Sequence, residues 1–231
     1  MPAMARVAVV RHNEEVALGR LGDFLSRHHP VEVWARDADF PEDVDAAVVL
    51  GGFMGAYESD LHPWLVDECE WLSSQVERGV PVLGICLGAQ LLAHALGGEA
   101  YEAPRPEVGV VELRYTDAGR EHPVASRLGD RAFFAHQDTF RLPPDAELLA
   151  STDRYPAVFQ AGSALGVQCH PETPPDDARH WLQYLEADML PRAGVTPERY
   201  LAEVDSHAEA GERSARDFFT AWFGSLDGSD R

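Results

Sequence analysis

The chain has 231 residues, of which 45% are hydrophobic, and its formal net charge is −20 at pH 7. A chain of this length and composition can bury a large core, and it lies within the range where α/β proteins form one domain, so we expect a single domain over residues 1–231. The negative charge disfavours nucleic acid or an anionic membrane surface as a partner, because both are themselves anionic.

Several classes of protein are disfavoured by what the sequence lacks. No apolar stretch is long enough for a signal-peptide core or a bilayer span, so we expect a cytoplasmic protein. The three cysteines, Cys69, Cys86 and Cys169, have no paired metal-ligand spacing, and an odd number argues against a disulfide framework. Motifs for ATP or a dinucleotide are absent as well. We therefore expect no metal and no organic cofactor.

The first half of the chain alternates apolar strands with helices. Buried strands are predicted from apolar runs at 6–10, 31–35, 46–52 and 80–86. Apolar residues at helical spacing predict helices between them, at 14–29 and 62–79. Strands that are apolar throughout and alternate with helices are typical of a parallel sheet covered on both faces. The sequence therefore predicts an α/β fold with a doubly wound, mostly parallel sheet.

The pattern changes after about residue 107. Short strands with turn-rich connections are predicted in VGVVELRY, RAFFAH, ELLAS and ALGVQCH. We expect these strands to extend the sheet and to form a small antiparallel addition. From about residue 174 the apolar residues return to helical spacing, so a helical C-terminal segment is predicted.

The segment GVPVLGICLGAQ, residues 79–90, places Cys86 between a predicted strand and a predicted helix. A nucleophile at a sharp strand-to-helix turn needs small neighbours, and Gly84 and Gly88 flank Cys86 at the required positions. The helix N-terminus stabilises a thiolate, and the N–H of Leu87 is placed to bind an oxyanion. The motif alone leaves an inert buried cysteine as an equal interpretation.

The segment ALGVQCHPE, residues 164–172, supplies a base for this thiol. His170 and Glu172 are two residues apart at the end of a predicted strand, where alternation directs both side chains to one face. Pro171 favours the extended conformation at His170. A carboxylate beside an imidazole fixes its tautomer and supports its protonated form. We therefore predict a catalytic triad of Cys86, His170 and Glu172.

Together, GICLGAQ and CHPE resemble the nucleophile and base motifs of class I glutamine amidotransferases. The chain looks most like the stand-alone, GMP-synthase-like glutaminase domains of that family. The resemblance extends over nearly the whole chain and includes VVLGGFMGAYE, HPWL and HQDTF. It implies a flavodoxin-like fold and the triad of Cys86, His170 and Glu172. It also implies an oxyanion hole formed by the N–H groups of Gly52 and Leu87.

The resemblance further implies substrate-binding residues, and the chain departs from the family at two positions. Gln90 would help to hold the glutamyl portion of the substrate. His136 and Asp138 would line the pocket, although a structural role for them stays open. Phe53 follows a glycine pair where the family often has proline; it restores an N–H, which leaves open whether the oxyanion hole is preformed. Gln137 replaces a frequent glycine and can reshape the pocket.

The implied reaction is hydrolysis of the γ-amide of glutamine through a cysteine thioester, which yields glutamate and ammonia. The acceptor reaction would take place on a separate synthetase or acceptor protein, because the glutaminase-like domain accounts for nearly the whole chain. A stand-alone γ-glutamyl peptidase with the same triad is the main alternative. A non-catalytic binding module is a minor one. Neither nucleic acid nor a membrane is an expected partner.

Overall fold

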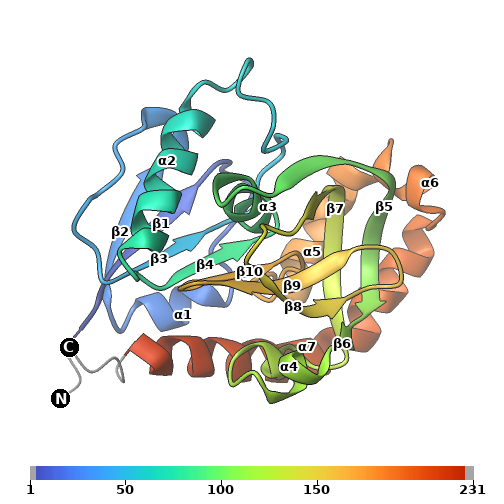
Figure 1. The fold of residues 1–231 in the computed structure, drawn as a ribbon. Coiled ribbons are helices and arrows are strands. Elements are labelled where there is room, and N and C mark those ends of the chain that lie inside the picture. The colour runs from blue at the N-terminus through green and yellow to red at the C-terminus, as the bar shows by residue number, and fades with distance from the viewer. Residues whose placement is uncertain (1–3, 227–231) are drawn as a thin grey trace.

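Two sheets organise residues 4–226, the part of the chain that the computed structural model describes (Figure 1). The smaller sheet pairs β5 (Glu99–Glu112) with β7 (Arg131–Arg141). The larger sheet has eight strands, in the spatial order β2 (His29–Trp34), β1 (Arg6–Arg11), β3 (Ala46–Val49), β4 (Val82–Ile85), β10 (Ala164–Val167), β9 (Pro156–Ala161), β8 (Glu147–Ser151) and β6 (Arg114–Tyr115).

The larger sheet changes direction at β10. Neighbouring strands from β2 to β10 run parallel, whereas β9, β8 and β6 are added in antiparallel pairs. The prediction of a mostly parallel sheet with a small antiparallel part is therefore confirmed. Strand β10 pairs directly with β4, and Ala164 lies opposite Val82. The two strands are thus neighbours although about 80 residues separate them in the sequence. This pairing brings the segment after β10 beside Cys86.

Helices cover both faces of the larger sheet (Figure 1). On one face lie α2 (Trp64–Glu77) and α3 (Leu87–Ala95), and on the other α1 (Leu21–Leu25) and the long α7 (Pro197–Leu226). Side chains of β1 alternate between the two cores, as a strand period of two requires. Thus Val9 packs in the core that contains α1 and α7, whereas Val10 packs in the core that contains α2 and α3.

A third core lies between the smaller sheet and the C-terminal helices. It contains buried side chains of β5, β7, α7, α5 (Pro175–Leu185) and α6 (Met189–Ala193). One short helix, α4 (Asp117–Glu121), follows β6 outside this core. No helix within residues 4–226 combines the length and apolar character needed to cross a membrane.

The helix predicted over 14–29 is wrong in extent. Only Leu21–Leu25 forms an α-helix, and the chain enters β2 at His29. Gly19 has a left-handed φ of +48°, and a Cβ there would lie 2.1 Å from the carbonyl oxygen of Glu172. The next N–H, that of Arg20, donates to the same oxygen at 2.8 Å. The segment therefore crosses the loop after β10 instead of forming earlier helical turns.

Candidate active site

Four loops meet where parallel strands of the larger sheet end. His12 follows β1, Gly51 and Gly52 follow β3, Cys86 follows β4, and residues 168–173 follow β10. The carboxyl ends of parallel strands form one edge, where ligands of open α/β sheets bind. A cavity of about 270 Å³ lies there. Six of the predicted site residues line it: Gly52, Cys86, Gln90, His136, Asp138 and His170.

Cys86 forms a strained turn between β4 and α3. Its φ of +53° and ψ of −106° lie in a region that a residue with a side chain rarely adopts. A Cβ on Gly84 would lie 2.5 Å from the carbonyl oxygen of Gly88, and one on Gly88 would lie 2.2 Å from the carbonyl oxygen of Val49. The prediction that this turn requires small neighbours is confirmed at both positions.

His170 and Glu172 form a buried pair. The Nδ1 atom of His170 lies 2.7 Å from Oε1 of Glu172, and the two residues are 4% and 0% exposed. The strand predicted to place them on one face is wrong, because β10 ends at Val167. A turn after the strand brings them together, in which the carbonyl oxygen of His170 accepts the N–H of Thr173 at 3.4 Å.

The side chains of His170 and Cys86 both contact Gly51. A Cβ on Gly51 would lie 3.2 Å from Cε1 of His170 and 3.6 Å from Cβ of Cys86. The Nε2 atom of His170 has no hydrogen bond of normal geometry within residues 4–226. Burial lowers the pKa of His170, but the negative charges of Glu172 and ionised Cys86 outweigh it and raise the pKa to about 10. The site therefore favours the protonated, imidazolium form of His170.

The two N–H groups expected to form the oxyanion hole are unpaired. Neither the N–H of Gly52 nor that of Leu87 has an acceptor among the described residues. Phe53, which replaces a frequent proline, uses its N–H to donate to Oδ1 of Asn13 at 2.9 Å. The departure from the family pattern thus provides a donor that ties the glycine loop to the residues after β1.

Gln90 and His136 line the cavity but bind protein groups. The side-chain N–H groups of Gln90 donate to the carbonyl oxygen of Asp138 at 3.0 Å and to Oε1 of Gln168 at 3.3 Å. Nδ1 of His136 also donates to the carbonyl oxygen of Asp138, at 2.7 Å, and its Nε2 lies 3.2 Å from Glu107. These contacts favour a structural role for His136, the alternative that the sequence left open.

Asp138 presents a carboxylate at the same wall of the cavity. Burial raises its pKa, and the hydroxyl of Tyr57 donates to Oδ1 at 3.0 Å, which opposes the increase. The neighbouring Gln137 lines the cavity too. Asp138 thus combines buried hydrogen bonds with access to the cavity, and it stays a candidate for contact with substrate.

Comparison with known proteins identifies the family. The model of the glutamine amidotransferase class-I family matches residues 21–185. This chain belongs to the class-I glutamine amidotransferase family. The resemblance and the fold class expected from the sequence are therefore confirmed, and the family is in general one of enzymes.

Individual relatives match this chain over different lengths. A glutamine-hydrolyzing GMP synthase of Aeropyrum pernix is 39% identical over 131 residues, which are 55% of this chain and 24% of that protein. The glutamine amidotransferase-like protein YfeJ of Salmonella typhimurium is 27% identical over 176 residues, 71% of each chain. The chain thus spans about a quarter of the length of that GMP synthase.

Solved structures resemble this chain over almost its entire length. A glutamine amidotransferase of Thermotoga maritima has a TM-score of 0.82 and 26% identity, with 97% of this chain and 98% of that chain covered. One of Methylobacillus flagellatus has a TM-score of 0.84 and 24% identity, with 97% and 96% covered. This second likeness concerns the fold alone.

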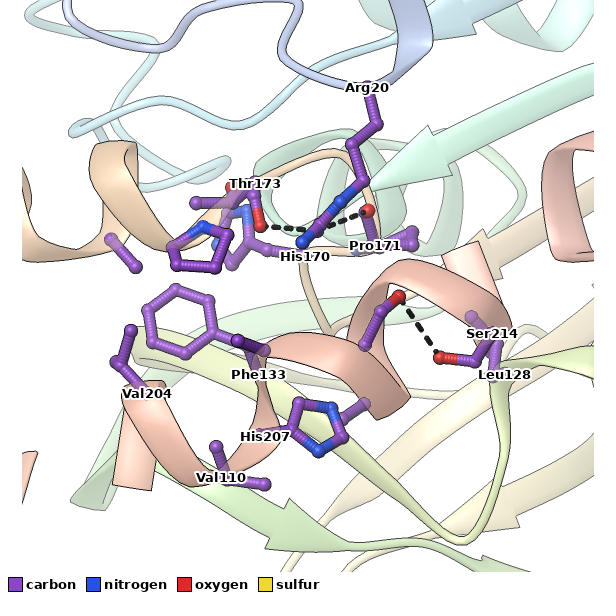
Figure 2. A pocket seen from close by; sticks show the side chains of 15 residues that line it. Arg20, Val110, Leu128, Phe133, His170, Pro171, Thr173, Val204, His207 and Ser214 are labelled. Atoms are coloured by element: carbon purple, nitrogen blue, oxygen red, sulfur yellow. Dashed lines mark hydrogen bonds between the residues drawn. The ribbon is translucent and has the colours of Figure 1, made fainter. Parts of the chain in front are cut away.

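Arg20 binds the backbone of the loop after β10 (Figure 2). Its Nη1 atom donates to the carbonyl oxygens of Pro171 and Thr173, and its Nε atom pairs with Glu212 of α7 at 2.7 Å. Arg20, Pro171 and Thr173 line a hollow of about 40 Å³, which His170 also lines. Arg20 thus connects α7 to the backbone of the loop that carries the buried pair.

Sequence reasoning missed several residues of the site. His12, Asn13 and Arg20 belong to no motif, and their only signal is a position shortly after the first strand. From α5, Trp181 lines the cavity and stands edge-on to His170, with ring centroids 4.9 Å apart. The helical C-terminal segment was predicted, but its contribution of a cavity wall was not.

Proposed function

We propose that the protein is a glutaminase that uses Cys86 as nucleophile and supplies ammonia to an acceptor reaction on a separate protein. One observation carries this proposal: the strained Cys86 at the start of α3 shares a cavity and a contact at Gly51 with His170, whose Nδ1 is held by Glu172. A nucleophile, a base and an orienting carboxylate are the parts of such a triad.

In the first half of the reaction, the Cys86 thiolate attacks the γ-carbonyl carbon of glutamine. A carbon–sulfur bond forms, and the carbonyl electron pair moves to oxygen, where the N–H groups of Gly52 and Leu87 stabilise the charge. His170 gives its Nε2 proton to the amide nitrogen. The carbon–nitrogen bond then breaks, ammonia leaves, and a γ-glutamyl thioester remains.

In the second half, water replaces ammonia. Neutral His170 removes a proton from the water, whose oxygen attacks the thioester carbon. Collapse of the second oxyanion breaks the carbon–sulfur bond and releases glutamate. The thiolate and the imidazolium return, and Glu172 supports the imidazolium throughout without being protonated.

The names of the relatives support glutamine as the source of the ammonia. The chain matches about a quarter of a GMP synthase whose name specifies glutamine hydrolysis, and it matches most of YfeJ. We infer from these names that the substrate of this protein is glutamine and that the ammonia serves an acceptor reaction.

A second candidate function is favoured by one wall of the cavity. Trp181, Tyr184 and Met189 form an apolar surface there, whereas glutamine has a small polar leaving group. A γ-glutamyl amide of a larger apolar amine would cover that surface. A γ-glutamyl hydrolase that acts without a partner is therefore the alternative.

Release of glutamate tests both candidates. The purified protein is given free glutamine and a panel of γ-glutamyl amines and peptides, with Cys86→Ala as the control. Weak hydrolysis of glutamine alone, lost in the control, supports a glutaminase with a partner. Fast hydrolysis of the apolar amides supports the alternative. Equal rates for the protein and the alanine variant would exclude covalent catalysis by Cys86.

A further inference from the structure

Two residues directly after β1 hold the loop that contains Gly51 and Gly52. His12 donates from Nδ1 to the carbonyl oxygen of Gly51 at 3.1 Å, and Asn13 accepts the N–H of Phe53 at 2.9 Å. Between these bonds, the N–H of Gly52 has no acceptor among the described residues. The loop is thus held on both sides of one free donor.

Glu68 of α2 limits which ring nitrogens of His12 can carry a proton. Nε2 of His12 lies 3.1 Å from both carboxylate oxygens of Glu68, and both side chains are 0% exposed. The carbonyl oxygen of Gly51 only accepts, so Nδ1 must carry a proton. An ionised Glu68 accepts from a doubly protonated ring, and a protonated Glu68 donates to a neutral one. In either state, Nδ1–H points to Gly51.

The bond to Gly51 determines where the N–H of Gly52 points. The described residues contain no cis peptide bond, and in a trans peptide the carbonyl and the N–H point in opposite directions. The carbonyl of Gly51 faces His12, so the N–H of Gly52 faces away from it. Gly52 lines the cavity, and Gly51 contacts Cys86 and His170. The free donor therefore belongs to a residue that lines the same cavity as Cys86.

A glycine pair needs such support. Glycine adopts left- and right-handed conformations almost equally well, so the peptide between two glycines rotates easily. Rotation would turn the carbonyl of Gly51 toward the cavity, where it would repel an oxyanion. A side chain at Gly52 cannot oppose the rotation, because a Cβ there would lie 2.6 Å from Cδ2 of Leu87 and 2.9 Å from Cβ of His12.

We propose that His12 and Glu68 form a positioning pair that preforms the oxyanion hole before substrate binds. The pair holds the Gly51–Gly52 peptide so that the N–H of Gly52 is free to donate to the oxyanion that forms on the substrate's carbonyl oxygen. This inference rests on the proposed function, because it assigns the pair to the same thioester chemistry. The sequence left open whether Phe53, in place of proline, leaves the oxyanion hole unformed. In this chain Asn13 accepts the N–H that Phe53 adds, so the loop stays held and the hole is formed.

Two matched double variants test the pair. His12→Leu/Glu68→Leu removes the donor to Gly51 and the buried charge together. His12→Asn/Glu68→Leu also lacks the charge, but the asparagine amide lies where Nδ1 was and can still donate. Leucine and asparagine have similar shapes, so the two variants differ chiefly in this one donor. Melting temperatures establish that both fold.

The kinetic readout separates positioning from general stability. The leucine variant is expected to lose about 10²–10³-fold in kcat, the effect of losing one oxyanion donor, with little change in KM. The asparagine variant should keep most of kcat. Alkylation of Cys86 by iodoacetamide forms no oxyanion at a carbonyl, so its rate should be the same in both. Equal kcat values in the two variants would overturn the proposal.

Two further measurements make the test decisive. If the leucine variant does not fold, His12→Gln and His12→Asn give the same contrast, because glutamine can reach Glu68 but not Gly51. Crystal structures of a matched pair show the orientation of the Gly51–Gly52 peptide without any substrate. An unchanged peptide in the variant without the donor overturns the inference. A wild-type protein that hydrolyses no γ-glutamyl compound overturns the proposed function instead, while the crystal structures still test the pair.

Discussion

His170 and His12 both lie next to Gly51, and each pairs with a buried glutamate, but they use their ring nitrogens differently. His12 uses both, with Nδ1 on a backbone carbonyl and Nε2 on the carboxylate. His136, which also lines the cavity, does the same. His170 binds Glu172 through Nδ1, and its Nε2 has no partner of normal geometry among the described residues.

The difference shows that a buried pair of histidine and glutamate is not by itself a reactive group. A ring with both nitrogens engaged can hold a backbone segment but cannot exchange a proton with a ligand. A ring with one free nitrogen at a cavity can do so. The pair of His170 and Glu172 therefore differs from the other two pairs. Its carboxylate lies at Nδ1 of the ring, whereas in the other two pairs the carboxylate lies at Nε2.

The largest effect is expected where the free nitrogen is removed. His170→Asn should lower kcat by about 10⁴-fold or more, because the proposed base is lost. His136→Asn should cost much less, since asparagine can still donate to the backbone carbonyl that Nδ1 binds. Steady-state kinetics on the best γ-glutamyl substrate measure both. Similar losses in the two variants would contradict the distinction between the histidines.

Loss of the carboxylate at Nδ1 should have the next largest effect. Glu172→Gln is expected to lower kcat by about 10²–10⁴-fold, because a neutral amide neither fixes the same tautomer nor supports the imidazolium. The melting temperature should show that the fold is retained. An unchanged rate in a folded variant would mean that Glu172 has been assigned the wrong role.

The stability of the protein should depend on pH through His170. Its folded pKa of about 10 lies above the ordinary value of 6.5, so the stabilisation is complete below pH 6.5 and is lost as the pH rises through 10. Glu172→Gln removes one of the charges that raise this pKa, so this variant should lose less stability over the same pH range. Thermal unfolding from pH 6 to pH 10.5 measures both profiles, and parallel curves would refute the expectation.

A smaller effect is expected from changes to Arg20 and Glu212, which support the loop after β10. Arg20→Met removes two hydrogen bonds to the carbonyl oxygens of Pro171 and Thr173, and a misplaced loop can cost up to about 10²-fold in kcat. Glu212→Gln should cost less, because its partially exposed ion pair with Arg20 contributes little. Kinetics and melting temperatures of both variants are compared. A greater loss in Glu212→Gln would show that α7 acts on the site by another route.

Much of the fold was predictable because its signals are local. The apolar runs of the first four parallel strands are short and flanked by helical patterns, so four strands with helices on both faces follow from periodicity. The helix predicted over 14–29 failed because periodicity does not reveal that Gly19 adopts a left-handed φ against Glu172. The strand predicted to reach His170 failed because it ends at Val167 in favour of a turn.

The sequence by itself determined the turn at Cys86, since the two glycines that permit it are two residues away on either side, and it determined that His170 and Glu172 are neighbours. The tertiary structure alone decided which other side chains reach them. His12 meets Glu68 across 56 residues because α2 shares one core with β1 on the same face of the sheet, and α5 supplies Trp181 to the cavity. Such contacts depend on how helices pack on a sheet, which no local pattern specifies.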